Sequence, residues 1–236
     1  MTNLIGISHT LNKEDISLVE IQSLNRESIN GFDNFSLKQD PSKADTYVNY
    51  SDYVLTFSVA LPVFLIFDKR ISKDWYKILL LYMETLTITT NFYEWGFLGP
   101  TFQNRFRPIT YYNQVIYDQK KSGYNRNSFY SGHTATAAVS TFFMAKVYCD
   151  YNPDIGNNKY FLYCAAAIPP LMVGYFRVKA MRHFPSDVMV GLGVGALFGI
   201  IIPEFHSFQG KNISMGLYST SDETGMAIKW QPGFLK

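Results

Sequence analysis

The chain has 236 residues, of which 47% are hydrophobic, and 21 basic and 19 acidic side chains give it a formal net charge of +2. This length fits one domain with short appendages, and the hydrophobic content is ample for a large core. Because acidic residues nearly match the basic ones, the composition argues against a nucleic-acid-binding protein that works by neutralising phosphates.

The first part of the chain, residues 1–51, is mostly polar and contains short apolar clusters. We expect it to form an N-terminal segment with one or two amphipathic helices. We expect residues 52–203 to form a helical bundle. The remaining tail, residues 204–236, alternates weakly around a turn-like stretch at 221–225, and this pattern predicts a small β-hairpin.

Five apolar runs follow the N-terminal segment, at 53–67, 75–98, 134–148, 160–176 and 188–202. Each is long enough for a helix, so the sequence predicts an all-α bundle with about five hydrophobic helices. Most runs are shorter than the roughly 20 residues that cross a bilayer core. The mean hydropathy of −0.05 also argues against a membrane protein. We expect Glu84, inside the second run, to hydrogen-bond between helices.

Two features favour a membrane-embedded bundle over a bundle outside the membrane, although the sequence leaves both open. Aromatic residues make up 17% of the chain, and Tyr and Trp are typical of membrane interfaces. Glycines recur along the fifth run at Gly191, Gly193, Gly195 and Gly199, and such small residues allow helices to approach closely. We therefore predict a multi-pass integral membrane protein.

Polar clusters lie at the ends of these runs. Arg105 and Arg107, with Pro108, follow the second run, where they could simply be charges at a helix exit. Ser131, Gly132 and His133 precede the third run. Ser131 is a natural helix N-cap, and the backbone N–H groups behind such a cap can bind a phosphate. A turn followed by a helix explains this second cluster equally well.

The third cluster, residues 177–187, connects the fourth and fifth runs. Pro185 suits the first turn of a helix, so His183 would precede that helix and Asp187 would lie in its first turns. A carboxylate there can accept a hydrogen bond from one imidazole nitrogen and leave the other free to attack. The alternative is a His/Asp pair that only caps the helix. Together, the three clusters supply what phosphoryl transfer needs.

The sequence resembles the type 2 phosphatidic acid phosphatase superfamily, which includes bacterial class A acid phosphatases and vanadium-dependent haloperoxidases. Its first motif, Lys-x6-Arg-Pro, ends here at Arg107-Pro108, but Pro100 stands in place of the lysine. Its second, Pro-Ser-Gly-His, stands as Tyr130-Ser131-Gly132-His133. Its third, Ser-Arg-x5-His-x3-Asp, stands as Phe176-Arg177, His183 and Asp187 with the spacing intact. The resemblance covers roughly residues 50–203.

By this resemblance, His183 would be the nucleophile, Asp187 its orienting carboxylate and His133 the general acid. The phosphate would be held by Arg107, Ser131, Gly132 and Arg177, without a metal or other cofactor. We expect Arg105 to supply the charge missing at Pro100.

The resemblance implies a membrane phosphatase that acts on a lipid phosphate or diphosphate through a phosphohistidine. Because successive apolar helices would run in opposite directions, the three polar clusters between them would meet at one end of the bundle. The loop 68–77 at the other end is basic, which is typical of a cytoplasmic loop, so we expect the site on the extracytoplasmic side. A lipid-binding protein that has lost catalysis and a vanadate-dependent haloperoxidase are the alternatives. The sequence identifies no protein partner.

Overall fold

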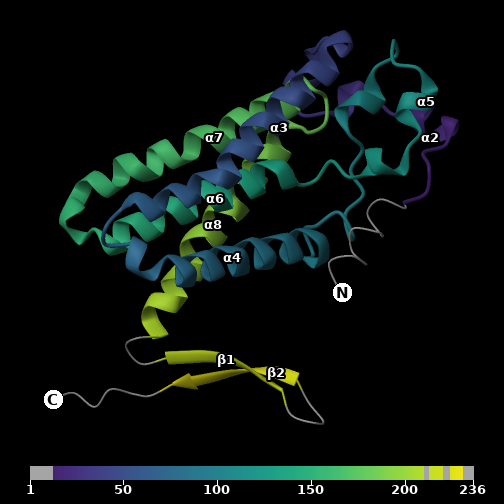
Figure 1. Cartoon of the computed structure of the whole chain (residues 1–236). Coiled ribbons are helices and arrows are strands. Elements are labelled where there is room, and N and C mark those ends of the chain that lie inside the picture. The colour runs from purple at the N-terminus through teal and green to yellow at the C-terminus, as the bar shows by residue number, and fades with distance from the viewer. Residues whose placement is uncertain (1–12, 210–212, 220–223, 231–236) are drawn as a thin grey trace.

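The computed structural model describes residues 13–209, 213–219 and 224–230. Within them, the main body is a bundle of five long helices (Figure 1). Their bounds are α3 Ala44–Ala60, α4 Trp75–Trp95, α6 Gly132–Tyr151, α7 Lys159–Lys179 and α8 Pro185–Gln209. The predicted helical bundle is therefore confirmed. Two short α-helices, α2 Leu18–Ser23 and α5 Tyr117–Lys120, lie outside it. The 3-10 helices of the described residues are η1 Arg26–Ser28, η2 Asp33–Lys38, η3 Pro41–Lys43, η4 Leu61–Phe67, η5 Ser72–Asp74, η6 Pro108–Tyr111, η7 Gly123–Arg126 and η8 Pro153–Asn158.

Helix α6 is the centre of the bundle and packs against α3, α4, α7 and α8. Its approach to α8 depends on the glycines of α8. A Cβ at Gly195 would lie 2.2 Å from the Ala135 carbonyl oxygen, and one at Gly191 would lie 2.5 Å from that of Ser131. The expected close contact is thus present at these positions. A Cβ at Gly193 would meet no other described atom within 4 Å, because this residue lies on another face of α8.

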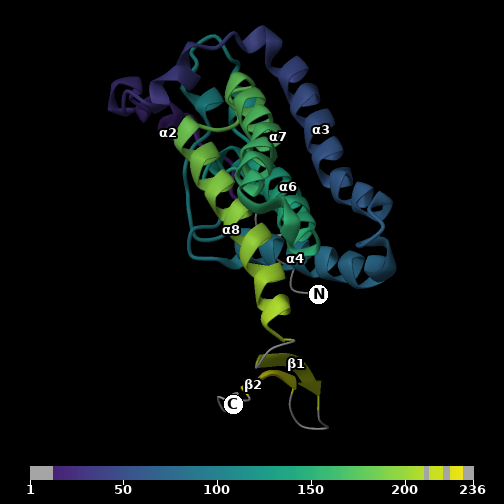
Figure 2. The ribbon, with the colours of Figure 1, turned by 90° about the vertical axis from the view of Figure 1, so that its left-hand side faces the viewer.

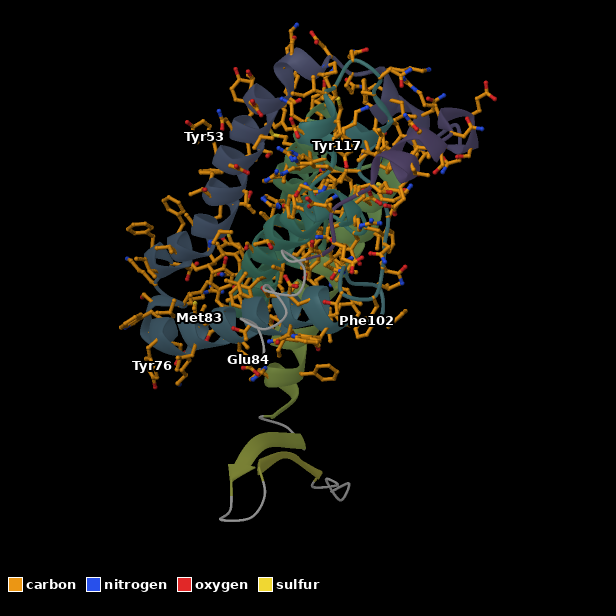
Figure 3. The ribbon with its side chains drawn as sticks, turned by 90° about the vertical axis from the view of Figure 1, so that its right-hand side faces the viewer. Tyr53, Tyr76, Met83, Glu84, Phe102 and Tyr117 are labelled. Carbon is orange, nitrogen blue, oxygen red and sulfur yellow. The ribbon has the colours of Figure 1, made fainter. Side chains whose placement is uncertain are left out.

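Three segments of the described chain are long and apolar enough to cross a membrane: Pro41–Phe67, Pro153–Lys179 and Pro185–His206. Their outer surfaces are also apolar, as are parts of α4. Tyr53 on α3 and Tyr76 and Met83 on α4 are at least half exposed (Figure 3). Exposed apolar side chains over this extent are typical of a bundle surrounded by lipid. These features support integration into a membrane.

Helices α4 and α6 are not among those three segments, because both carry many polar side chains. Helix α6 contains several Thr and Ser residues that bond within the bundle; Thr141 Oγ1, for example, donates to the Ala166 carbonyl on α7 (2.7 Å). On α4, Glu84 Oε2 lies 3.2 Å from Nε2 of His206 on α8. The prediction that Glu84 pairs between helices is confirmed.

The N-terminal segment packs against the long connection between α4 and α6. Ser17 begins α2 with a capping box that Glu20 completes, and Glu20 also pairs with Arg126 (2.9 Å). The Asp15 carboxylate accepts a hydrogen bond from the Gly123 N–H (3.1 Å). Among residues 13–43, α2 is the one α-helix, and α3 begins at Ala44, before the expected segment ends at residue 51. The segment is held by long-range contacts that its own sequence does not display.

Both expected boundaries of the bundle fall inside helices, since α3 begins at Ala44 and α8 continues beyond residue 203. At the end of the bundle away from the N-terminal segment, Arg70 pairs with Asp154 (2.9 Å), which joins the loops 68–77 and 149–159. Beyond α8, strands β1 Ile213–Ser219 and β2 Thr224–Trp230 form an antiparallel hairpin in which Ile213 is opposite Trp230 (Figure 2). Most of the expected turn, residues 220–223, lies outside the described residues.

Candidate phosphate-binding site

A cavity of about 270 Å³ lies where α4, α6 and the connection between α7 and α8 meet. Four of the predicted site residues line it: Arg107, Gly132, His133 and His183. They come from three separate parts of the chain, which the helices bring to one end of the bundle. Residues that the sequence motifs did not indicate also line it, notably Tyr93, Glu94, Tyr124 and Asn127.

His183 is buried, with 3% of its surface exposed, and its tautomer follows from one hydrogen bond. Nδ1 lies 2.6 Å from the carbonyl oxygen of Ser128. Because a carbonyl can only accept, Nδ1 carries the hydrogen and Nε2 keeps its lone pair. Burial lowers the pKa of His183 well below its ordinary value, and the positive charge of Arg107 lowers it further. The imidazole is therefore neutral at physiological pH, as a nucleophile must be.

Asp187 does not orient His183 in the way we expected. Its Oδ2 lies 3.9 Å from His183 Nδ1, beyond hydrogen-bond distance. Instead, Oδ2 accepts from the Ser128 hydroxyl (2.6 Å) and from the Phe184 N–H (2.7 Å). Because α8 begins at Pro185, Asp187 falls where a carboxylate caps the first turn of a helix. It fixes Ser128, and the Ser128 carbonyl in turn orients the imidazole.

Arg105 does not reach the phosphate site, contrary to the expectation that it replaces the missing lysine. Its guanidinium pairs with Asp187 and, at 2.7 Å, with Asp33 from the N-terminal segment. It also donates to the Ser186 hydroxyl (2.8 Å) and stacks over the Phe184 ring at 4.3 Å. The side chains of both carboxylates are almost fully buried. Their charge holds Arg105 behind the first turn of α8, away from the cavity.

Three other arginines concentrate positive charge around the cavity. Arg107 is buried, stacks over the Tyr124 ring at 3.9 Å, and donates to the Asn127 carbonyl (3.3 Å). Arg177 is also buried, and its Nη2 pairs with Asp52 on α3. Arg182 adjoins them: burial lowers its pKa, and so does the nearby charge of Arg107. Such mutual repulsion indicates a site shaped for an anion.

One donor in this cluster has no acceptor. Arg177 Nε is buried and makes no hydrogen bond with any residue that the structure describes. A buried guanidinium N–H without an acceptor costs free energy, on the order of 1–3 kcal/mol or more for a charged group. A phosphate oxygen next to Arg177 would satisfy it. The cluster therefore offers an anionic ligand a donor that the described residues leave unpaired.

The start of α6 has the geometry predicted for the second cluster. Ser131 is the N-cap, and its hydroxyl accepts from the Thr134 N–H (3.4 Å). The Ser131 hydroxyl is therefore engaged in capping α6. A Cβ at position 132 would lie 2.9 Å from the Tyr93 ring, so only glycine fits there. His133 follows, with Nε2 at 3.7 Å from Asp52 Oδ1.

Sequence reasoning missed two charged residues near the cavity, Asp52 and Arg182. Arg182 had a signal, because it immediately precedes His183. Asp52 had none, since it belongs to a different helix and to no motif. Asp52 is brought to the site only by the packing of α3 against α6 and α7.

Comparison with known proteins assigns a family to this arrangement. The sequence matches the PAP2 superfamily across residues 75–211. Among solved structures, the chain is similar to a transmembrane PAP2-type phosphatidylglycerolphosphate phosphatase from Bacillus subtilis. That match has 20% identity, covers 87% of this chain and 94% of the other, and has a TM-score of 0.49. No curated protein matches the sequence significantly.

Proposed function

Because the chain belongs to the PAP2 superfamily, we propose that it is a membrane phosphatase that hydrolyses a lipid phosphate or diphosphate monoester through a phosphohistidine on His183. The observation that carries this proposal is the state of His183. The Ser128 carbonyl holds the hydrogen on Nδ1, which leaves Nε2 unprotonated in a residue that lines the same cavity as His133 and Arg107. An oriented, neutral imidazole beside anion-binding groups suits nucleophilic attack on phosphorus.

The reaction has two steps. In the first, His183 Nε2 forms a bond to phosphorus, the bond from phosphorus to the leaving oxygen breaks, and His133 gives that oxygen a proton. In the second, water attacks phosphorus, His133 takes a proton from it, and the nitrogen–phosphorus bond breaks to release inorganic phosphate. His133 thus acts first as general acid and then as general base, and it regains its proton at the end of the cycle.

The charge on the phosphoryl oxygens is met by arginines and by the N–H groups at the start of α6. Arg107 and Arg177 are both buried, so their charges act in a medium that screens them weakly. Gly132 lets the backbone come close to the ligand, and Ser131 holds the helix start in place. Groups of this kind stabilise the transition state electrostatically, so we propose that no metal is required.

Arg182 is our candidate for the charge that the family's lysine would supply. Pro100 stands at that lysine's position, and its carbonyl accepts a hydrogen bond from Lys13. Arg105 is bound to Asp33 and Asp187. Arg182, in contrast, is close enough to Arg107 and Tyr124 for their charges to act on it.

The cavity volume bears on the substrate. About 270 Å³ is enough for a phosphorylated head group but small for a whole lipid. The head group would enter the cavity while the lipid's apolar part stays against the exposed apolar surface of the bundle.

We further propose that the site faces away from the cytoplasm. The basic residues Lys69, Arg70 and Lys73 lie in the loop at the opposite end of the bundle, which the positive-inside rule assigns to the cytoplasm. Cysteine labelling tests this in a variant whose native cysteines are replaced by serine. Asn113→Cys, on an exposed loop at the site end, should react with a membrane-impermeant thiol reagent on intact cells. Lys73→Cys should react only after permeabilisation; the reverse pattern would contradict the orientation.

The activity itself is tested by phosphate release from a panel of lipid phosphates in detergent, with and without EDTA. We expect release that survives EDTA, and a phosphohistidine trapped after brief exposure to substrate. His183→Ala should abolish both, whereas Asp154→Asn, an exposed change at the opposite end of the bundle, should affect neither. A covalent label on Ser131 would refute the assigned roles, and a lack of turnover on every substrate would favour the lipid-binding alternative.

A further inference from the structure

Asp52 is a carboxylate at the edge of the phosphate site that no motif predicts. It lies on α3, where its Oδ1 pairs with Arg177 Nη2. The same oxygen is 3.7 Å from His133 Nε2. One carboxylate oxygen therefore touches the arginine that would hold the phosphate and lies near the histidine that would protonate the leaving group.

This carboxylate comes from outside the part of the chain that matches the family. The match covers residues 75–211, and α3 lies entirely before it. Helix α3 packs alongside α6 and α7 (Figure 2). From α3, Asp52 pairs with Arg177 and lies near His133. Asp52 is within a segment long and apolar enough to cross a membrane. An ionisable residue in such a segment is costly and points to a function.

A carboxylate and a phosphate compete for the same guanidinium. Both present oxygens that accept from the planar fork of Arg177. Asp52 engages Nη2, while Nε has no acceptor among the described residues. The guanidinium of Arg177 therefore has one donor nitrogen paired with Asp52 and another without an acceptor in the described part of the chain. Because 49% of the Asp52 side chain is exposed, surrounding protein atoms do not lock the carboxylate onto Arg177.

When a phosphate displaces Asp52 from Arg177, the carboxylate can pair with His133 instead. Burial disfavours a protonated imidazole at His133, and so do the charges of Arg177, Arg107 and Arg182. A general acid must nevertheless hold a proton when the leaving oxygen departs. Asp52 Oδ1 lies 3.7 Å from His133 Nε2, close enough to form an ion pair with a protonated imidazole. A negative charge there would favour the protonated form.

We propose that Asp52 is a positioning residue with two states: it binds Arg177 when the site is empty, and it pairs with protonated His133 once a phosphoryl group has taken its place on Arg177. The inference rests on the proposed function, because it assumes that Arg177 binds phosphate and that His133 is the acid. Asp52 touches no reacting atom in this scheme, and its own proton content does not change.

The two roles predict opposite effects of one substitution, Asp52→Asn, which removes the charge and keeps the shape. Without the competing carboxylate, inorganic phosphate should bind about tenfold more tightly, a usual size for such coupling. Without the partner of protonated His133, kcat should fall about tenfold, a part of what general acid catalysis contributes. A carboxylate that served only the fold would not tighten phosphate binding while slowing turnover.

The experiment measures phosphate affinity by calorimetry and kcat by phosphate release, on full-length protein in detergent. Asp154→Asn is the matched control, since Asp154 is also an exposed carboxylate that pairs with an arginine, but at the opposite end of the bundle. A thermal unfolding curve for each variant verifies folding. Tighter phosphate binding together with lower kcat supports the proposal. Weaker or unchanged phosphate binding in Asp52→Asn, relative to Asp154→Asn, overturns it.

The outcome for the wild type separates this inference from the proposed function. A wild type that binds phosphate without turnover would refute the phosphatase proposal, yet Asp52→Asn should still bind phosphate more tightly. If neither wild type nor Asp52→Asn binds phosphate, both proposals fail. If the wild type is active and Asp52→Asn behaves like Asp154→Asn, only the inference fails.

Discussion

Replacement of Arg105 by alanine separates a structural arginine from a phosphate-binding one. In the structure, Arg105 lies between Asp33 and Asp187, whose side chains are 1% and 0% exposed. Its removal leaves two buried carboxylates without their shared counter-charge. Breaking a buried ion pair from one side costs about 3–5 kcal/mol. Arg105 is itself 29% exposed, and Asp33 and Asp187 keep other donors, so we expect a loss of about 2–3 kcal/mol in unfolding free energy.

The kinetic effect of Arg105→Ala should be smaller than its effect on stability. Asp187 still caps Phe184 and holds Ser128, so the imidazole of His183 stays oriented. We expect kcat/KM to fall by less than about tenfold, whereas removing a phosphate ligand such as Arg107 should cost roughly a hundredfold or more.

The assay pairs unfolding by denaturant in detergent with phosphate release from the best lipid substrate. Asp33→Asn added to Arg105→Ala should recover part of the lost stability, because it removes one of the stranded charges. Arg70→Ala is a control, since Arg70 pairs with Asp154 and both side chains are more than half exposed, so its loss should change the unfolding free energy far less. A stable Arg105→Ala protein with a hundredfold lower kcat/KM would refute this reasoning and restore Arg105 as a phosphate ligand.

Three further predictions concern the site. His133→Ala should slow formation of the phosphoenzyme more for a lipid monophosphate than for a diphosphate, because an alkoxide needs the proton more than a phosphate does; equal slowing in single-turnover assays would argue against His133 as the acid. Because burial and Arg107 lower the pKa of His183, the neutral nucleophile should persist to low pH. After correction for substrate ionisation, the midpoint of the acidic decline in kcat/KM should then lie below pH 6.5. A midpoint above pH 6.5 would contradict this prediction. Arg182→Ala should reduce kcat/KM and vanadate inhibition by roughly a hundredfold, whereas unchanged inhibition would exclude Arg182 as the substitute for the lysine.

Much of the fold could be predicted from local patterns in the sequence. Each apolar run lies in helical structure, the first shared by α3 and η4, because helix formation depends on residues within one or two turns of one another. Ser131 caps α6, and Pro185 begins α8, as residue type alone indicated. The glycines of α8 could be assigned to a close helix contact, because removing a Cβ has the same consequence wherever the helix packs.

The arrangement of charge around the site was decided by tertiary structure. The sequence motifs indicated His183 and Asp187, but the hydrogen-bond acceptor for His183 is the Ser128 carbonyl, which no pattern of side chains reveals. The sequence does not determine whether Arg105 points toward the cavity or away from it. Its orientation is set by Asp33, 72 residues earlier in the chain. Asp52 reaches Arg177 across a separation of 125 residues. Helix propensity and capping act between neighbours in the chain, whereas pairing of buried charges depends on which helices pack together, and only the folded bundle determines that.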